Sequence, residues 1–480
     1  MGNNSRFFFV LLGVGAALGI GSVWLYPYLS FRLTGLFFIP YFIALIVLGM
    51  PLLMLEFSIG QHFNRNVVDL FASVRKWFSS IGWLMIFNAF IMMSYYAVAL
   101  SWHIIYLFTS FGLQWKNNAG LYFFSNVIQV SKGFSGFTQF SLPVFIALIA
   151  AWIVIFFYIK EGFESMKRGF LITFPVFIIL MLFFLMYSLT LDNALNGVYA
   201  FLKPRLENFF SLDIWVASFS LAVVSLGLSF GVMHALARKC KGFAAENSMI
   251  IIILELMAGF IAGFIMFAIL GLLSVKSGIG VDNLASHDIS FSFIVLSQAL
   301  PLFYKPTLLS LLFFMLWSIF FIFGAASLAY SITHVLVHKF KTKHRNAAIF
   351  VSGFGFLLGL MFIIKPGFYI MDIAGHFAYY NVLIAVFLEV LAIGWFFDSE
   401  KISNHINQYS ILKIGKLWRL LVRYLIPLIL ILLLLFQIKS DISANYNNYP
   451  LWALLVFGAG TVIAPLVIAF LMPRRILDRK

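Results

Sequence analysis

The most constraining feature of the sequence is a series of apolar runs that are each long enough to cross a lipid bilayer. A hydrocarbon core of about 30 Å needs roughly 20 apolar residues in a helix. Twelve runs meet this requirement, near residues 7–29, 35–59, 81–111, 141–159, 169–189, 214–236, 248–273, 307–337, 347–364, 369–397, 417–436 and 451–472. Because backbone polar groups inside a bilayer must be paired within the segment, these runs predict an all-α integral membrane protein with 12 transmembrane helices.

The composition excludes several classes of function. Hydrophobic residues make up 63% of the 480 residues and charged residues 10%, whereas soluble domains have about 45–50% and about 25%. The net charge of +15 comes from short basic clusters between the apolar runs, so nucleic acid is not an expected partner. Cys240 is the single cysteine, which rules out an internal disulfide and a thiolate cluster. Metalloprotease and nucleophile motifs are absent, so we predict no enzyme and no organic cofactor.

The distribution of basic residues orients the predicted helices. Cytoplasmic loops are enriched in Lys and Arg, and a cytoplasmic N-terminus places 23 of the 32 Lys and Arg residues in cytoplasmic loops. A thirteenth apolar stretch, Ile289 to Tyr304, is short and polar, and we interpret it as part of a re-entrant or lid segment at about 276–306. Both termini are therefore predicted to be cytoplasmic. The one glycosylation-type triplet, Asn3-Asn4-Ser5, lies on this side, which favours a bacterial inner membrane.

Two of the runs are interrupted by glycine. The first contains Gly13, Gly15, Gly19 and Gly21, and the sixth contains the segment SLGLSFG at 225–231. A helix can break inside a membrane only where protein or a water-filled cavity satisfies the freed backbone groups. Broken helices five spans apart are typical of an inverted-repeat transporter. The alternative is that these small residues only allow close helix packing.

Several stretches resemble one transporter family. They include GAALGIGSVWLYPY and TGLFFIPYFIALIVLGMPLLMLEFSIGQ within Gly15–Gln61, SYYAVALSW at Ser94–Trp102, and GFYIMDIAGHF at Gly367–Phe377. These residues resemble the neurotransmitter:sodium symporters, especially their bacterial amino-acid members with the leucine-transporter fold. The resemblance implies a 5+5 inverted repeat with discontinuous helices 1 and 6, plus two C-terminal helices. The corresponding units would be 1–190, 191–400 and 401–480.

The resemblance also implies a substrate site at the middle of the membrane. The substrate carboxylate would meet exposed N–H groups of the broken first helix, and the Tyr96 hydroxyl would be a second donor. Amine carriers of the family have an aspartate where this chain has Gly19, so the expected substrate bears its own carboxylate. The alternative for Tyr96 is a ring that only packs. The matching substrate positions are Ala17, Gly19, Gly21, Met92, Tyr96, Val224, Ser225, Gly227, Phe230, Leu328 and Ile332.

Two sodium sites follow from the same resemblance. The first would use Ala17, Ser22, Ser225 and Glu255, and the second Gly15, Leu18, Gly324 and Ser327. One hydroxyl of the second site is lost, because the family position carries Leu328 here. An acid in a membrane span is costly, so Glu255 is predicted to be a cation ligand or a proton carrier, with a neutral hydrogen-bonded acid as the alternative. Glu56 and Glu389 match acids that look structural, and we expect them to fasten helix ends.

The gates of the family are changed in this chain. The outer arginine and aspartate are replaced by Leu25 and Gly375, and Asp372 matches a different acid of the motif. We therefore expect apolar closure of the mouths, or none. The predicted function is sodium-coupled symport of an amino acid or a similar small zwitterion. Alternatives are proton coupling, selectivity for amines, and an uncoupled substrate-gated receptor or leak pathway. The expected partners are this small-molecule substrate, sodium and the lipid bilayer; the oligomer is left open, with a homodimer as one candidate.

Overall fold

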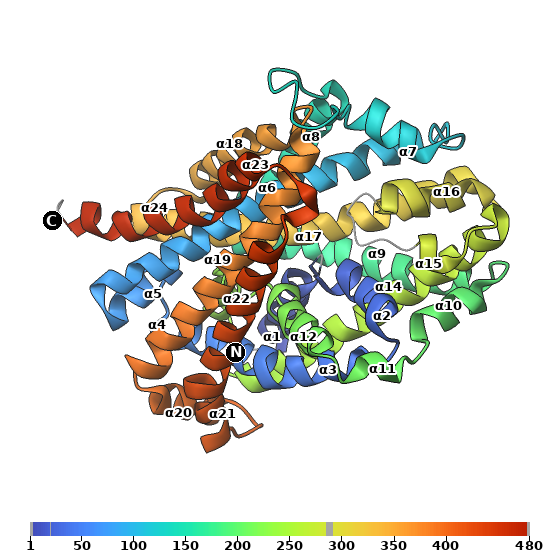
Figure 1. Ribbon diagram of the computed structural model, residues 1–480. Helices are drawn as coiled ribbons and strands as arrows, with labels where there is room; N and C mark the ends of the chain where they lie inside the picture. The colour runs from blue at the N-terminus through green and yellow to red at the C-terminus, as the bar shows by residue number, and fades with distance from the viewer. Residues whose placement is uncertain (1–2, 20, 285–290, 478–480) are drawn as a thin grey trace.

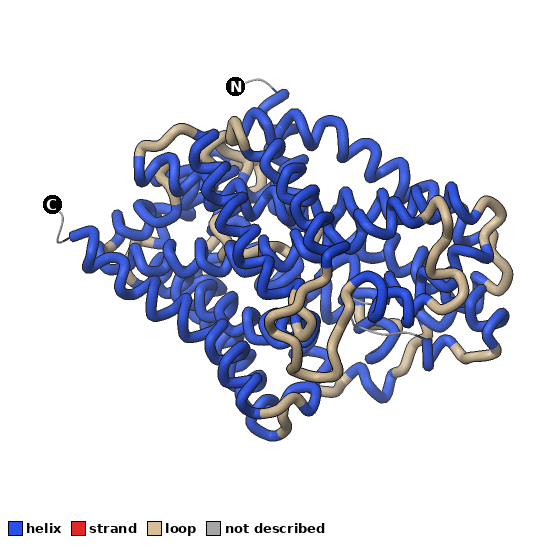
Figure 2. The backbone as a smooth tube through the Cα atoms, turned by 90° about the horizontal axis from the view of Figure 1, so that it is seen from above, coloured by secondary structure: helices blue, strands red, loops and turns tan. Residues whose placement is uncertain are grey.

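The polypeptide is built from helices, as the apolar runs predict. The computed structural model describes residues 3–19, 21–284 and 291–477, and within these ranges it contains no strand beyond one isolated bridge between Phe140 and Ile364. Figures 1 and 2 show how the helices pack around one another.

The helices have the following bounds. The N-terminal third contains α1 (Asn3–Ala17), α2 (Tyr26–Leu33), α3 (Phe38–Ala44), α4 (Met50–Phe63), α5 (Val67–Val74), α6 (Ser79–Thr109), α7 (Ala119–Leu121) and α8 (Leu142–Ile159). The middle contains α9 (Phe163–Leu189), α10 (Ala194–Leu202), α11 (Leu206–Phe209), α12 (Leu212–Ser225), α13 (Val232–Ala237), α14 (Ala244–Ser277), α15 (Val281–Leu284), α16 (Ser297–Ala299) and α17 (Pro306–Phe340). The C-terminal part contains α18 (His344–Ile363), α19 (Gly367–Trp395), α20 (Ser399–Tyr409), α21 (Lys416–Leu420), α22 (Ile426–Ser443), α23 (Leu451–Ala453) and α24 (Gly460–Leu477).

Short π and 3₁₀ segments continue or join these helices. The π segments are η1 (Gly21–Leu25), η2 (Leu45–Gly49), η4 (Tyr122–Val127), η5 (Ser292–Leu296), η7 (Leu421–Leu425) and η9 (Leu454–Ala459), and the 3₁₀ turns are η3 (Lys76–Phe78), η6 (Leu300–Leu302) and η8 (Tyr446–Asn448). Local sequence explains several starts. For example, α8 begins where the Ser141 hydroxyl accepts from the Val144 amide and Pro143 occupies the first turn.

Within the described ranges, ten helices are long and apolar enough to cross a membrane. The count becomes eleven when α1 and the η1–α2 pair, bent by 56°, are taken as one span. The predicted sixth span, 214–236, is divided into α12 and α13, and α12 alone is shorter than a span. The count of twelve therefore stays a prediction. The predicted lid contains short helices rather than a crossing helix, with its residues 285–290 outside the described ranges.

The centre of the bundle is formed by α6 and α17. In the most apolar segments of the spans that contain α6 and α17, 78% and 72% of the residues are buried. The corresponding fraction for the last span, Leu451–Met472, is 22%. The outer helices α8, α9, α22 and α24 carry many exposed Leu, Ile and Phe side chains, which is the surface expected to face lipid. The C-terminal end of α24 projects beyond the neighbouring helices (Figure 1).

Candidate substrate and ion site

The break predicted in the sixth helix is present between α12 and α13. Gly227, Ser229 and Gly231 adopt positive φ angles of 62°, 59° and 71°. This conformation is easy for glycine and costly for serine. The freed backbone groups have partners: the Ser229 amide donates to Glu56 Oε1 at 2.7 Å, and the Phe230 carbonyl accepts from the Ser331 hydroxyl at 2.7 Å. The break is therefore stabilised by specific hydrogen bonds from other elements of the fold.

The first helix ends at Ala17 and resumes at Gly21, and this break lies directly against the other. A Cβ at Gly21 would lie 2.9 Å from the Ser225 Cα, and one at Gly227 would lie 3.0 Å from the Ala16 carbonyl oxygen. Glycine is needed at both positions because no larger side chain lets the two backbones approach so closely.

A cavity of about 90 Å³ lies at these breaks. Ten of the predicted site residues line it, and the wall also contains Ala16, Val232, Gly375, Ala378, Tyr379 and Val382. The ten are Gly19, Met92, Tyr96, Val224, Ser225, Gly227, Phe230, Gly324, Ser327 and Leu328. Ala17, Gly21 and Ile332 are buried but are not in the wall. The volume suits a small ligand, since pockets for drug-sized molecules have about 300–1,000 Å³.

Sequence reasoning missed the contribution of α19 to this wall. The sequence identifies Gly375 only as a changed gate position and gives no motif that includes Tyr379. Their spacing of four residues puts them on one face of a helix, which is the signal that could have indicated a lining role.

The Tyr96 hydroxyl lies beside Gly19 of the first break. A Cβ at Gly19 would lie 3.1 Å from the Tyr96 Oη, and the Tyr96 ring packs so closely on Gly324 that a Cβ there would be 2.3 Å from its Cε1. The ring also meets Phe321 edge-on, with 5.7 Å between centroids. The hydroxyl thus lies beside the first break while the ring is held from behind.

The acid in α14 lies beside the same breaks. Glu255 is fully buried, and Tyr41 Oη donates to its Oε1 at 2.6 Å while lying 2.8 Å from Ser225 Oγ. The hydroxyls of Ser22 and Ser225 also face this carboxyl group. Its Oε2 has no hydrogen-bond partner, and no Lys, Arg or His among the described residues pairs with it. Three of the four residues of the first predicted sodium site are therefore together, and Tyr41 is a neighbour that the sequence did not reveal.

The residues of the second predicted sodium site are less closely gathered. Ser327 and Gly324 line the cavity, and Ser327 Oγ is buried without a hydrogen-bond partner. Gly15 instead faces Phe170, whose ring would lie 2.2 Å from a Cβ there. Leu18 is buried, and its amide still donates to the Val14 carbonyl as in a helix. This site stays a prediction.

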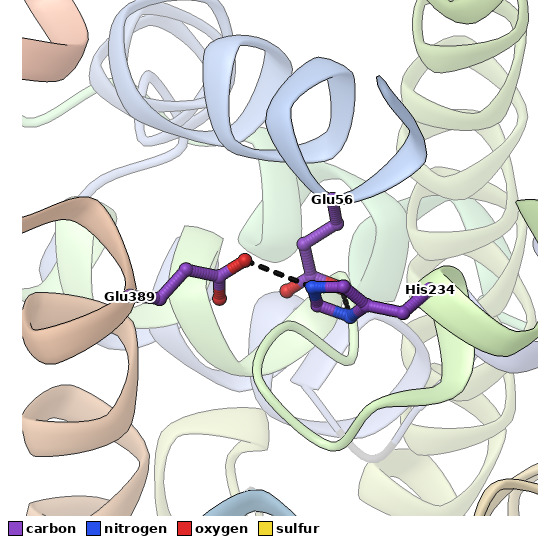
Figure 3. Close-up of side chains that lie close together, drawn as sticks. All are labelled: Glu56, His234 and Glu389. Carbon is purple, nitrogen blue, oxygen red and sulfur yellow. Dashed lines mark hydrogen bonds and ion pairs between the residues drawn. The ribbon is translucent and has the colours of Figure 1, made fainter. Parts of the chain in front are cut away.

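Glu56 and Glu389 do fasten helices, and they do so together with a histidine. His234 of α13 lies between them, with its Nε2 3.0 Å from Glu389 Oε1 and its Nδ1 3.4 Å from Glu56 Oε2 (Figure 3). His234 belongs to no recognised motif of the sequence, although a histidine at the end of an apolar run was an available signal.

The two mouths differ. Asp372 accepts from Tyr446, Asn447 and Tyr449, so it is held by the segment before the last span and does not stand in for the lost gate acid. At the other mouth, polar contacts replace the expected apolar closure. Arg238, just after α13, donates to Asn64 Oδ1 at 3.1 Å and to His334 Nε2 at 2.5 Å, and Lys339 pairs with Asp69.

Comparison with known proteins gives a match along almost the whole chain. Residues 2–119 and 113–478 match the Sodium:neurotransmitter symporter family. An uncharacterized sodium-dependent transporter of Methanocaldococcus jannaschii is 28% identical over 98% of this chain and 97% of the relative. The sodium- and chloride-dependent GABA transporter 2 of Homo sapiens is 24% identical over 94% and 82%, and the sodium- and chloride-dependent taurine transporter of Rattus norvegicus is 26% identical over 98% and 84%.

These relatives are sodium-dependent membrane transporters and not enzymes, which confirms the class of function predicted from the motifs. The match includes both broken helices, the cavity wall and the segment around Glu255. The chain belongs to the sodium:neurotransmitter symporter family.

Proposed function

We propose that this protein is a sodium-coupled symporter for an amino acid or a similar small zwitterion. The observation that carries the proposal is the contact of the two breaks at one small cavity, with Gly19 and the Tyr96 hydroxyl beside each other at its wall. Gly19 leaves backbone groups accessible and provides no carboxylate for an amine. The relatives are named for GABA and taurine, and both of these molecules carry an acid group as well as an amine.

Sodium would bind next to the substrate in this proposal. The first ion would take the Ala17 carbonyl, the hydroxyls of Ser22 and Ser225, and the free Oε2 of Glu255, because sodium takes oxygen ligands and a buried carboxylate needs a positive partner. The second would use the carbonyls of the Gly15 and Leu18 region with Gly324 and Ser327.

The proposed architecture has twelve spans in an inverted repeat. Units 1–190 and 191–400 would each contribute one discontinuous helix, α1 with η1–α2 and α12 with α13, and 401–480 would add two helices. Both termini would lie in the cytoplasm of a bacterial cell, with the protein in its inner membrane.

A thermal-shift screen followed by counterflow tests the function. Purified protein is heated with α-amino acids, GABA, taurine and their decarboxylated or desulfonated analogues, each in sodium and in choline. Stabilisation that needs both sodium and an acid-bearing ligand is expected, because ligands that bind only the native state raise its stability. Counterflow of the labelled hit in proteoliposomes then separates a carrier, which exchanges substrate, from a receptor or leak, which does not.

Proton coupling through Glu255 is the second candidate. It is favoured by the same unpaired Oε2, which would be satisfied by a proton as well as by an ion. Uptake driven by a pH gradient in sodium-free vesicles would select it.

A further inference from the structure

Three titratable side chains form a buried cluster outside the cavity wall. Glu56 comes from α4, His234 from α13 and Glu389 from α19, and each is at most 1% exposed (Figure 3). One ligating atom of each lies within 4.8 Å of the others. None of the three is required by the proposed sodium or substrate site.

The arrangement of polar atoms in the cluster favours an additional proton. Ser229 satisfies one oxygen of each acid, because its amide donates to Glu56 Oε1 at 2.7 Å and its hydroxyl to Glu389 Oε2 at 3.0 Å. Of the other two oxygens, Glu389 Oε1 lies within hydrogen-bond distance of His234 Nε2, at 3.0 Å. Glu56 Oε2 lies 3.4 Å from His234 Nδ1, and neither of these two atoms has a hydrogen-bond partner among the described residues. A neutral imidazole has one N–H. With both acids ionised, one contact would therefore place a nitrogen lone pair against an oxygen lone pair.

The charge balance favours the same proton. Two carboxylates and a neutral imidazole carry two buried negative charges, and one proton reduces this to one. No basic side chain of the surrounding elements supplies a cation among the described residues: Arg6 on α1 donates to Asn247, Lys339 on α17 pairs with Asp69 of α5, and Arg238 after α13 donates to His334 of α17 and to Asn64. From α5, the Phe71 ring also lies 6.1 Å from the His234 ring.

The cluster connects α13, the part of the sixth predicted span after the break, to α4 and α19. His234 lies on α13, and Ser229 lies in the unwound segment whose Gly227 and Phe230 line the cavity. At Gly60 the packing of α4 on α13 is so close that a Cβ would lie 2.7 Å from the His234 carbonyl oxygen. Alternating access moves one part of such a protein against another around a fixed site, and α13 cannot leave α4 and α19 without breaking these contacts.

We propose that Glu56, His234 and Glu389 form a proton-binding site, separate from the sodium ligands, which holds one proton while α13 is closed against α4 and α19. Loss of the proton leaves a nitrogen lone pair of His234 facing a carboxylate oxygen and two negative charges in the cluster. This repulsion favours separation of α13 from α4 and α19. Opening of the predicted cytoplasmic mouth is thereby linked to pH. This inference does not depend on which ion drives transport.

Cys240 is a native reporter for this movement. It is the single cysteine of the chain, it is 2% exposed, and its amide donates to the carbonyl of Ala237, the last residue of α13. Burial raises the pKa of its thiol, so it reacts slowly while α13 is closed. The experiment measures the rate of maleimide labelling of purified protein in detergent with choline as the cation, from mildly acidic to mildly alkaline pH. Each rate is divided by that of unfolded protein at the same pH.

Two matched variants distinguish a proton site from a structural contact. In Glu56→Gln, the amide donates to His234 Nδ1 and its oxygen still accepts from Ser229, so the variant reproduces the proton-loaded state without a titrating group. In Glu389→Gln, the new amide donates to His234 Nε2 while its oxygen accepts from Ser229. The Nδ1–H tautomer of His234 can then donate to Glu56, so this variant also needs no additional proton.

For the wild type we expect the normalised labelling rate to increase with pH by up to about tenfold per unit, as one linked proton allows. Glu56→Gln should stay slow and lose this dependence. Glu389→Gln should likewise stay slow and lose this dependence, whereas a merely structural contact would be loosened by either substitution. Equal pH profiles for the wild type and Glu56→Gln would overturn the proposal.

Two further measurements need no folded Glu56 variant. In bilayers containing ¹⁵N-histidine protein, the His234 resonances, identified by their loss in His234→Gln, should show both ring nitrogens protonated or strongly hydrogen-bonded at neutral pH. One bare ring nitrogen would refute the site. Stoichiometric binding of Zn²⁺ or Mn²⁺ that His234→Gln abolishes would make the cluster a metal site and also overturn the proposal.

Discussion

Replacing Tyr96 with Phe tests how the proposed site recognises its substrate. The ring of Tyr96 is held by Gly324 and Phe321, so the substitution keeps the packing and removes the hydroxyl beside Gly19. A buried hydrogen bond to a charged group is worth about 1.5–3 kcal/mol. Since about 1.4 kcal/mol is a factor of ten, a ligand bearing a carboxylate should bind roughly 10- to 150-fold more weakly. A decarboxylated analogue, which has no partner for the hydroxyl, should be almost unaffected.

The assay is binding of both ligands, in sodium, to the wild type and to Tyr96→Phe. The quantity that matters is the ratio of the two losses, because damage to the fold would weaken both ligands together. Equal losses would return Tyr96 to a packing role. Tighter binding of amines than of their parent amino acids to the wild type would refute the argument from Gly19, and would mean that the changed gates accompany a change to amine substrates.

Four other outcomes are expected. Sodium should raise substrate affinity, and substrate should raise sodium affinity by the same factor; identical substrate binding in choline would exclude sodium linkage. Glu255→Gln should keep part of the sodium-dependent binding if Glu255 is an ion ligand, or lose pH-driven uptake while still exchanging substrate if it carries a proton. Gly227→Ala should cost about 1–2 kcal/mol from its positive φ alone, and more because its Cβ would lie 3.0 Å from the Ala16 oxygen; an unchanged melting temperature would contradict this. In α20, burial and then the neighbouring His62 lower the pKa of His405, so the unfolded chain takes up a proton before the folded protein does as pH falls. The free energy of unfolding should therefore decrease below about pH 6.5. Thermal melts at several pH values should show this decrease in the wild type and a smaller one in His405→Gln.

The sequence by itself determined the helical class, most of the long helices and the location of both breaks. Apolar runs and glycine spacing are local properties, and the requirement that backbone groups be paired in a bilayer converts them into structure. It also indicated most of the cavity wall, because motif positions such as Gly19, Tyr96 and Gly227 matched those of a known family. The last two predicted spans needed no tertiary information, because each corresponds to one continuous apolar helical segment, Lys416–Asn448 and Leu451–Met472.

The tertiary structure alone decided which polar side chains meet inside the bundle. Tyr41 and Glu255 are 214 residues apart, and Glu56 and His234 meet beside Ser229 of the unwound segment and Glu389 of α19. Such pairs leave no periodic signal, because a buried polar group needs one correctly placed partner and that partner can come from any element packed against it. The glycines of the sixth run indicate where it breaks into α12 and α13, but not what stabilises the break. Its partners, Glu56 for the Ser229 amide and Ser331 for the Phe230 carbonyl, come from elements that only the fold brings within reach.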